Sequence, residues 1–445
     1  MGEKIFLKYA SSVAAVTKAK IRKEVISLAV PAFGAFAAPS LFLLIDSWVV
    51  ASLGAEPLAG LGSASAVIVT ITGLLIFLTF GTTTSVARAF GAKNDALIKK
   101  TINNSLTSGL ILGFILTFLV VVFANPLSLF LGTEASAPYA QEYLIFASLG
   151  LFFLILNLSL VGILRGVADS KTTFWVSLIS VLINLVLVLL LVRVFELGIK
   201  GSAIATSIGA MSGSVLYLYK LRSKHKIFIS GIEFSFAPLL EVLKENIALM
   251  WRTLMLRVAL LAALYSATLQ GTNTLAAFQV MLAIWMGLAL VLDSLEVAAQ
   301  VLAAKAFGAK DKALLNLTNK TLINYSVYLG IFLVLGLLAL YSFGPELFTE
   351  NLAVHDLLRS VWILLALVQV LNAVVFVTDG ILMGVNDYKF LAIVQTISLV
   401  GLLIVLYFAQ SLLAILVALA IWMIVRLIFQ VWRVQIGLPR GSFAN

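Results

Sequence analysis

Cysteine is absent from this 445-residue chain, and histidine occurs only twice, at His225 and His355. Without cysteine the chain has no disulfide, no thiol nucleophile and no cysteine metal site. Two histidines are too few for the histidine clusters that bind metals, and no cluster of acidic residues on one face suggests a catalytic centre. We therefore expect no metal, no cofactor and no enzymatic activity.

Charged residues are also scarce. They make up 11% of the chain against 62% hydrophobic residues, and the mean hydropathy is +1.11. Soluble globular chains are about 25% charged and about 45–50% apolar. Runs of the roughly 20 apolar residues that cross a bilayer recur along the whole length. Because backbone polar groups inside a bilayer are satisfied internally, this composition predicts an all-α integral membrane protein.

Hydrophobic runs between charged, glycine, proline or asparagine residues predict twelve transmembrane helices. The first six lie near residues 25–52, 58–88, 102–124, 139–164, 173–192 and 201–220. The second six lie near residues 246–270, 275–304, 316–342, 357–384, 389–408 and 412–432. The segments outside these two lobes (25–220 and 246–432) are an N-terminal segment at 1–24, a charged linker at 221–245 and a tail at 433–445.

The net charge of +10 indicates topology rather than nucleic-acid binding. With a cytoplasmic N-terminus and alternating loops, 25 of the 30 Lys and Arg residues fall on the inside and only Arg193, Lys200 and Arg359 fall outside. The remaining two, Arg252 and Arg257, lie inside the seventh span. This positive-inside bias predicts a plasma (inner) membrane protein, in contact with the lipid bilayer, with both termini in the cytoplasm.

An internal repeat divides the chain into two halves. The sequence RAFGAKND at 88–95 recurs as KAFGAKDK at 305–312, and GILRGVADSK at 162–171 recurs as GILMGVNDYK at 380–389. The two matches have nearly the same separation along the chain, which is hard to obtain by chance. Six spans is an even number, so both halves begin on the same side of the membrane, and we predict two parallel six-helix bundles.

The repeated motifs carry a family resemblance. It rests on LRGVADSK at 164–171, DGILMG at 379–384, the glycines of LGA (53–55) and LG (61–62), and Asp46 in the first span. At these positions the chain resembles the multidrug and toxic compound extrusion (MATE) family, specifically its DinF-like branch. The resemblance implies two bundles around a central cleft, alternating access, and export of small amphipathic or cationic organic compounds driven by proton or sodium entry. We expect a monomer.

Asp46 is the candidate coupling residue of the first half. A carboxyl group inside a span is costly and tends to mark function, and burial favours proton uptake over ionisation. The alternative is an interfacial Asp that caps a helix end. Pro31 and Pro39 each remove a backbone hydrogen bond and predict a kink in the same span.

Asn184 and Thr206 are the expected neighbours of Asp46, either as hydrogen-bond partners or as sodium ligands; ordinary interhelical hydrogen bonding is the alternative. Family members resembling this chain carry a second acid four positions after the equivalent of Asn184, where this chain has Val188. A hard cation prefers several oxygens and more negative charge, so the departure favours protons over sodium.

The second half has a different set of candidates. Arg257 in the seventh span is expected to pair with Asp293 or Glu296, which share one face of the eighth. The pair would either contact substrate and relay protons or serve as a static salt bridge.

Two aromatic residues of the second half and a neighbouring glutamine could line the cleft, although scattered aromatic residues are more often interfacial anchors or part of the packing. The candidates are Phe278, Gln279 and Trp285. Asp379, at the inner end of the tenth span, is interpreted as a structural helix-end group. A flippase for lipid-linked saccharides is the alternative function, and it would require a more basic cavity than Arg257 and Arg252 provide.

Overall fold

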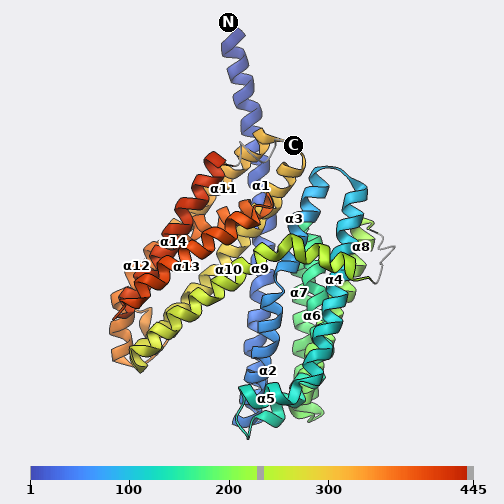
Figure 1. The fold of residues 1–445 in the computed structure, drawn as a ribbon, viewed down its shortest axis with the longest axis vertical. Helices are drawn as coiled ribbons and strands as arrows, with labels where there is room; N and C mark the ends of the chain where they lie inside the picture. The colour runs from blue at the N-terminus through green and yellow to red at the C-terminus, as the bar shows by residue number, and fades with distance from the viewer. Residues whose placement is uncertain (1, 228–234, 438–445) are drawn as a thin grey trace. The chain divides into compact units, whose positions relative to one another are not determined.

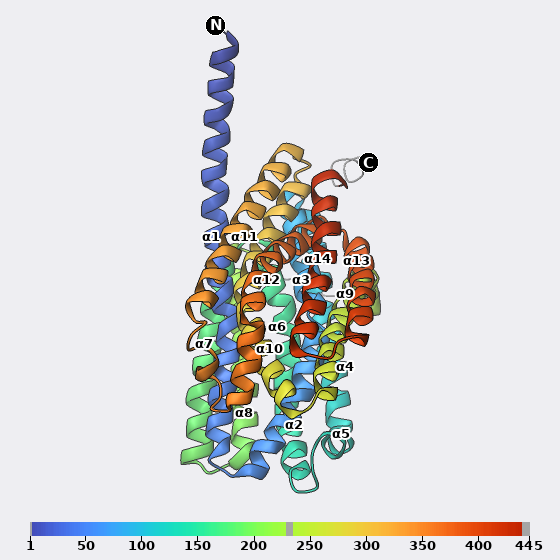
Figure 2. The ribbon, with the colours of Figure 1, turned by 90° about the vertical axis from the view of Figure 1, so that its left-hand side faces the viewer.

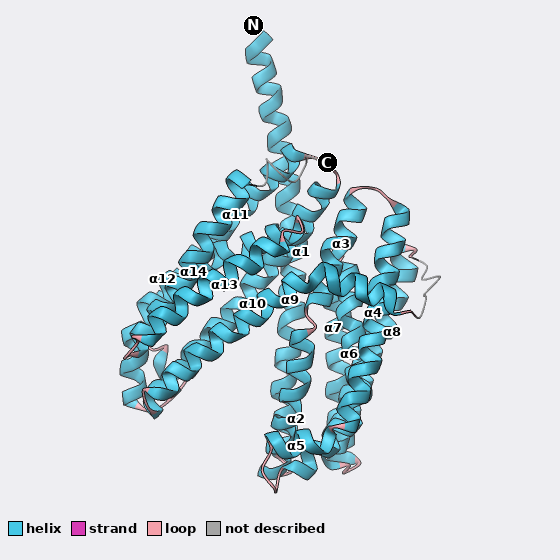
Figure 3. Ribbon diagram, viewed as in Figure 1, coloured by secondary structure: helices cyan, strands magenta, loops and turns pink. Residues whose placement is uncertain are grey.

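The computed structural model describes residues 2–227 and 235–437, with side chains described from residue 19 onward except at 40–43. In this part of the chain every regular element is helical and no strand occurs (Figure 3). Twelve helical segments are long and apolar enough to cross a membrane. The predicted all-α fold with twelve spans is confirmed.

The chain divides into two compact units, which we call the N-unit and the C-unit. The N-unit is Val30–Ile247, and the C-unit is Met1–Ala29 together with Ala248–Asn445. The first helix, α1 (Gly2–Ala51), contributes to both units, because it is continuous through the boundary. The predicted separate N-terminal segment is therefore part of this helix, since no glycine or proline interrupts the sequence between Gly2 and Pro31.

The N-unit is a bundle of helices that run lengthwise beside one another (Figures 1 and 2). After α1 come α2 (Ala55–Leu74), α3 (Phe77–Gly91), α4 (Asp95–Val122), α5 (Ala124–Leu131), α6 (Ala137–Gly166), α7 (Ser170–Val188), the π-helical turn η1 (Leu189–Val194) and α8 (Gly198–His225). The central helix is α6, which packs against α2, α3, α4 and α8. Small residues allow this: a Cβ added to Gly150 would lie 2.8 Å from the Cα of Ser207 on α8.

The second predicted span, 58–88, differs from expectation because it is two helices. A turn at Leu75 and Ile76 separates α2 from α3. Thr79, at the start of α3, donates a hydrogen bond to the carbonyl oxygen of Leu158 on α6, at 2.9 Å. The break therefore gives the second half of this span its own attachment to the central helix.

The first repeated motif forms the same turn in both halves. Lys93 and Lys310 adopt left-handed backbone conformations, with φ of 51° and 55°. Asn94 and Asp311 follow them, and each side chain accepts a hydrogen bond from the backbone N–H three residues later, as helix N-caps do. The matched sequences thus encode matched helix–turn–helix geometry.

The second repeated motif behaves in the same way. Ala168 and Asn386 have φ of 64° and 65°. The next residue in each half is an aspartate that bonds to a cation at the end of that half's last helix: Asp169 to Lys224 at 2.7 Å, and Asp387 to Arg433 at 2.7 Å. Both repeats therefore close the same pair of helix ends with an ion pair.

The C-unit is a second six-helix bundle. Its helices are α9 (Phe236–Leu269), α10 (Thr272–Gly308), α11 (Lys312–Ala339), α12 (Leu352–Gly384), α13 (Tyr388–Tyr407) and α14 (Leu412–Trp432), with short turns η2 (Pro345–Leu347) and η3 (Arg433–Gly437). The central helix is α12, which packs against α10, α11 and α14 around an apolar core.

Helices occupy most of the predicted linker at 221–245. Its first residues complete α8, and from Phe236 it forms the start of α9; residues 228–234 lie outside the described residues. The first three turns of α9 belong to the N-unit, where Glu241 accepts hydrogen bonds from Lys100 at 2.6 Å and Asn104 at 2.9 Å. Of the predicted tail, residues 433–437 form η3, and 438–445 lie outside the described part of the chain.

Candidate functional site

Asp46 is a buried carboxyl group near the end of α1, with 1% of its surface exposed. Ser202 on α8 donates a hydrogen bond to Oδ1, at 2.7 Å. The second oxygen, Oδ2, has no hydrogen-bond partner among the described residues, and no Lys or Arg of that set forms an ion pair with it. A lone buried carboxyl group with one unoccupied oxygen is suited to exchanging a proton or contacting a cation.

The two predicted neighbours lie together beside this carboxyl group. Thr206 is one helical turn after Ser202 on α8, so both side chains share a face. The Asn184 amide on α7 donates to the Thr206 hydroxyl at 3.4 Å, and the Tyr143 hydroxyl on α6 lies 3.3 Å from the same oxygen. Three helices thus contribute to the polar network around Thr206, and Asp46 on α1 bonds to Ser202 one helical turn away.

The sequence did not predict Ser202 and Tyr143 as members of this site. The spacing of four residues between Ser202 and Thr206 is a signal that could have identified Ser202, because it places both on one helix face. Nothing in the sequence distinguishes Tyr143 from the other tyrosines. Val188, where an acid was expected, packs instead against Val49 and Ala205 in a small apolar cluster.

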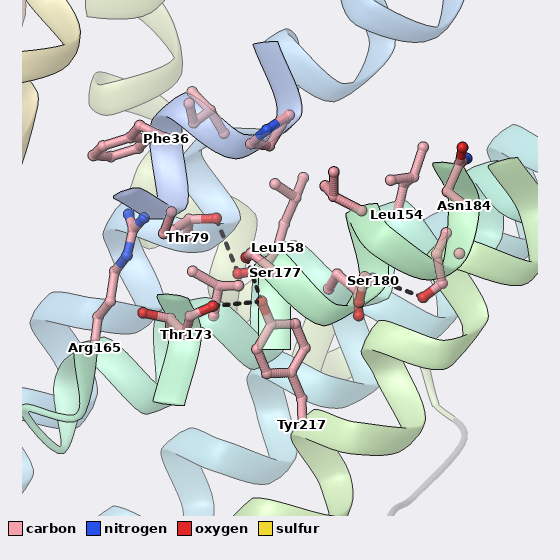
Figure 4. Close-up of a pocket in the computed structure, with 18 of the residues that line it drawn as sticks. Phe36, Thr79, Leu154, Leu158, Arg165, Thr173, Ser177, Ser180, Asn184 and Tyr217 are labelled. Carbon is pink, nitrogen blue, oxygen red and sulfur yellow. Dashed lines mark hydrogen bonds between the residues drawn. The ribbon is translucent and has the colours of Figure 1, made fainter. Parts of the chain in front are cut away.

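A pocket of about 370 Å³ extends through the N-unit from this network. It runs between residues of α1, α3, α6, α7 and α8 (Figure 4). Its lining consists of Ala35, Phe36, Pro39, Ile76, Thr79, Phe80, Leu154, Asn157, Leu158, Val161, Arg165, Thr173, Ser177, Ser180, Val181, Asn184, Thr206, Gly209, Ala210 and Tyr217. The volume falls in the range of small-molecule sites, and the walls are mainly apolar with a few polar groups, as such sites are.

Arg165 and Asn184 lie at opposite ends of the pocket (Figure 4). Arg165, on α6, is 4% exposed, and its guanidinium lies 4.6 Å from the centroid of the Phe36 ring. Tyr217 donates to the carbonyl oxygen of Thr173 at 3.3 Å and lies 2.9 Å from the Ser177 hydroxyl. The pocket therefore has one cationic end and one end that adjoins the Asp46 network.

The two prolines of α1 lie within an unbroken helix. Pro39 lines the pocket, and Pro31 follows the N-unit boundary by one residue. Neither proline supplies an N–H to the helix, so both are positions at which α1 lacks a backbone hydrogen bond. A change of bend there remains a prediction.

The C-unit contains a buried ion cluster centred on Asp379, which is 1% exposed. Arg252 on α9 and Arg426 on α14 both donate to Oδ2 of Asp379, and Gln430 donates to Oδ1 at 2.6 Å. Glu296 on α10 lies 4.0 Å from Arg252. In contrast to Asp46, this carboxylate is fully occupied by donors.

The cluster corrects two sequence predictions. The arginine that pairs with Glu296 is Arg252 rather than Arg257, which is exposed on α9 and forms no ion pair within the described chain. The two arginines are five residues apart, about 140° around a helix, so only one of them points into the bundle. Asp293 lies three residues before Glu296 on α10, partly buried. Asp379 is the centre of the cluster and more than a helix-end group.

The distribution of charges over the loops predicts a cytoplasmic Arg426, but this side chain is 2% exposed within α14. A single charge near the end of an apolar run does not reveal whether it faces water or a buried partner.

The proposed cleft residues of the second half are distributed differently from expectation. Phe278 is fully buried and Trp285 is 6% exposed, both inside the apolar core of the C-unit. They pack against other helices of their own bundle, so the prediction that they line a cleft is wrong. Gln279, the neighbour of Phe278, is exposed on the surface of the unit.

Asp169, in the loop between α6 and α7, has the perturbed acidity expected of an ion-paired carboxylate. Burial disfavours its charged form, but hydrogen bonds from Lys224, Thr172 and His225 outweigh burial and lower its pKa from 3.8 to about 2. Its side chain also caps α7 by accepting from the Thr172 N–H at 3.1 Å. This site serves the scaffold at the ends of three helices.

Two tandem six-helix halves, twelve membrane-crossing segments and a pocket beside a buried carboxyl group define a multi-pass membrane protein built as a transporter. The MatE family model matches residues 31–190 and 250–409, one copy in each half of the chain. The chain belongs to this family, the MATE multidrug efflux transporters.

Known proteins agree with that placement. Protein DETOXIFICATION 42 of Arabidopsis thaliana is 29% identical over 349 residues, which cover 76% of this chain and 67% of the relative. Probable multidrug resistance protein YoeA of Bacillus subtilis is 26% identical over 277 residues, 58% of each chain. A crystal structure of MATE in the bent conformation superposes with a TM-score of 0.86 at 21% identity, over 97% of this chain and 99% of that one. The last comparison shows the shared fold.

Proposed function

We propose that this protein is a proton-driven antiporter of the DinF-like branch that exports small amphipathic organic compounds by alternating access. Asp46 is its coupling carboxyl group. In this proposal the protein lies in the plasma (inner) membrane with both termini in the cytoplasm, as the distribution of Lys and Arg over the loops predicts.

The observation that carries the proposal is the state of the Asp46 carboxyl group. One oxygen accepts from Ser202, while Oδ2 has no partner among the described residues and no ion-paired cation holds the group charged. A carboxyl group in such surroundings can gain or lose one proton without breaking a salt bridge. Burying a carboxyl group in a membrane span without a counter-ion costs free energy, and residues buried in this way tend to be functional.

Coupling requires that substrate and proton affect the same groups. Asn184 and Thr206 belong both to the polar network near Asp46 and to the wall of the pocket. Phe36 and Pro39 on α1 line the same pocket, and α1 also carries Asp46. A change in the protonation of Asp46 that rearranges α1 would therefore alter the pocket, with Pro31 and Pro39 as the positions where the helix bends.

Sodium coupling is the second candidate, because Oδ1 of Asn184 and Oδ2 of Asp46 both lack hydrogen-bond partners in the described structure. Two oxygens and one formal charge make a poor site for a hard cation, and Val188 contributes neither. Protons are therefore favoured.

The flippase alternative requires cations that bind pyrophosphate. In the described part of the C-unit the two buried arginines, Arg252 and Arg426, already donate to Asp379. The N-unit pocket adds one cation, Arg165, among mainly apolar walls, which is less positive charge than a pyrophosphate group calls for, so this arrangement speaks against the flippase.

The test is efflux from proteoliposomes loaded with ethidium or with 2-naphthalenesulfonate. An inward proton gradient should accelerate efflux of at least one probe, and an inward sodium gradient should not. Asp46→Asn should abolish the response, whereas Asp356→Asn, which neutralises an exposed acid at the start of α12, should leave it unchanged. A proton response that survives in Asp46→Asn would contradict the proposal, and a response to sodium alone would replace it with the second candidate.

A further inference from the structure

We infer that Arg257, on an exposed face in the middle of α9, binds the acidic group of organic anions that the protein exports. The inference rests on the proposed export of amphipathic compounds, because it names their charge and adds a second binding position, in the C-unit. It departs from the sequence-based expectation of cationic substrates.

Arg257 lies in the middle of an apolar segment of α9. The exposed charged residue nearest before it on this helix is Glu245, and the helix ends next to Gln270. These two residues are twelve and thirteen positions from Arg257, roughly 18 and 20 Å at ~1.5 Å per residue. Because the hydrocarbon core of a bilayer is about 30 Å thick, Arg257 lies close to its middle.

The side chain of Arg257 points away from its own bundle. Ala259 and Ala263, on the opposite side of α9, are fully buried in the apolar core of the C-unit. Asp379 and Glu296 lie at Arg252, and no acid forms an ion pair with Arg257 in the described chain. Arg257 is therefore a cation on the outer surface of the unit, without a counter-ion among the described residues.

A charged side chain at this depth is costly against lipid. Arginine side chains reach the interface from positions near helix ends, whereas Arg257 is about three turns from each end of the apolar segment. Charged residues of membrane spans face either a bundle interior or a water-filled path, and they often mark the route of a substrate. Since Arg257 does not face the interior of its bundle, we place it on a face that meets water.

The adjoining face of α10 leaves room for a ligand. The two helices are joined by the short turn at Gln270 and Gly271, and both bury their other faces in the same apolar core. Counted from this turn, Arg257 is at about the level of Ala283 and Gly287, which are both exposed. A Cβ added to Gly287 would have no neighbouring atom within 4 Å.

The surroundings of Arg257 indicate an amphipathic anion. Leu254 and Leu261, about one turn before and after it, are exposed on the same side of α9. A guanidinium binds a carboxylate or sulfonate through two parallel N–H donors and repels a cation. One cation suits one acidic group, with the apolar body of the compound on the two leucines. Lipid phosphates lie at the interface, too far away to be this partner.

The internal repeat supplies an independent argument. The family-model matches begin at residues 31 and 250, and the repeated motifs begin at 88 and 305 and at 162 and 380. These separations place the counterpart of Arg257 within residues 38–40 of α1, which read Ala-Pro-Ser and carry no charge. The shared fold therefore does not require a cation at this position, and a substrate-binding role explains why the C-unit has one.

The absence of cysteine from the chain allows a direct test of whether Arg257 faces water. In nanodiscs of zwitterionic lipid, which are open to solvent on both sides, the Arg257→Cys variant should react with the charged thiol reagent sulfonatoethyl methanethiosulfonate. Ala263→Cys in the apolar core and Ile397→Cys on an exposed apolar face of α13 should react about tenfold or more slowly, because thiols in apolar surroundings ionise less readily. Equally slow reaction of all three variants would overturn the inference.

The preference for anions is tested by equilibrium binding in the same nanodiscs, without any gradient. The probes are three compounds of one shape: 2-naphthoate, neutral 2-naphthamide and cationic 2-naphthylmethylammonium. We expect 2-naphthoate to bind the natural protein about tenfold or more tightly than 2-naphthamide, and the cation to bind most weakly.

Three variants assign the preference to one side chain. Arg257→Gln should lose the tenfold advantage of 2-naphthoate and keep the affinity for 2-naphthamide within about twofold. Arg257→Glu should reverse the order, so that the cation binds most tightly. Arg359→Gln removes another exposed arginine of the C-unit, one that is paired with Glu346, and should bind all three probes as the natural protein does.

The inference is overturned if the natural protein binds the cation or the amide as tightly as 2-naphthoate, or if Arg257→Gln keeps the preference for 2-naphthoate. Loss of the preference in Arg359→Gln would also contradict it, because any exposed arginine of the unit would then have the same effect. Failure of proton coupling in the efflux experiment would leave the preference for 2-naphthoate intact, so the two proposals can fail separately.

Discussion

Asp46 in the N-unit and Asp379 in the C-unit are both 1% exposed, yet their surroundings are opposite. Asp46 accepts one hydrogen bond from a serine and has an oxygen without a partner in the described chain. Asp379 accepts from two arginines and a glutamine. A carboxylate held by two cations stabilises a bundle, whereas one without a cation is available for coupling. Burial alone therefore does not identify a functional acid; its partners do.

The two halves share a scaffold and differ in chemistry. The turns at Ala168 and Asn386 have nearly equal φ angles, and each precedes an ion-paired aspartate. Directly before the aligned motifs, however, Asp379 corresponds to Val161, an apolar wall of the pocket. The repeat thus specifies where helices begin and end, while residues one or two turns away have diverged into a pocket in one unit and an ion cluster in the other.

Substitution of Asp379 tests most directly the difference between the two buried acids. Asp379→Asn leaves Arg426 buried without its counter-ion and leaves Arg252 with only Glu296, 4.0 Å away, so we expect a loss of about 3–5 kcal/mol in the free energy of unfolding. Asp46→Asn removes no ion pair and should cost less than about 1 kcal/mol. Both are measured by SDS-titration unfolding in the same detergent.

A second substitution controls for the Asp379 result. If the loss arises from uncompensated charge, Arg426→Gln in the Asp379→Asn background should restore part of the stability. Equal stability of Asp46→Asn and Asp379→Asn would show that the two acids do not differ as described.

A smaller difference in stability is expected between overpacking the core of the C-unit and overpacking the pocket wall of the N-unit. Ala263 is fully buried in the apolar core of the C-unit, while Ala210 lines the pocket of the N-unit. Ala263→Leu should cost about 1–3 kcal/mol through overpacking. Ala210→Leu extends into open volume and should be tolerated within about 1 kcal/mol while weakening ligand binding. Differential scanning fluorimetry of the two variants tests this, and the reverse order would argue against an open pocket.

The smallest effect concerns Asp169 and the acid stability of the N-unit. Because its folded pKa of about 2 lies below the ordinary 3.8, Asp169 contributes stability that is complete above about pH 4 and is lost as the pH falls towards 2. Asp169→Asn keeps a helix cap but loses this contribution, on the order of 1 kcal/mol at neutral pH, since the half-exposed Lys224 is screened by solvent.

Unfolding of the two proteins across pH 5 to 2 is the measurement for Asp169. The curves should converge towards pH 2. A constant difference over the whole range would rule out a contribution from this charge.

Sequence patterns predicted the scaffold well because length, hydropathy and repetition act locally. The twelve spans and the parallel repeat follow from such patterns. The sequence patterns do not show how deeply a side chain is buried or which face of a helix turns into the bundle. Arg252 and Arg257 look alike in the sequence, and only the packing of the helices brings Arg252 to Glu296. The pocket was not predictable either, since its apolar walls have the composition of a core.

The central claim is that Asp46, and no acid of the C-unit cluster, carries the coupled proton. It is tested by proton release when ethidium or 2-naphthalenesulfonate, whichever the protein exports, binds to purified protein in weakly buffered detergent, followed with a pH-sensitive dye. The natural protein and Glu296→Gln should each release up to one proton per bound ligand, depending on the starting pH, and Asp46→Asn should release none. Undiminished release from Asp46→Asn, or its loss in Glu296→Gln, would contradict the account.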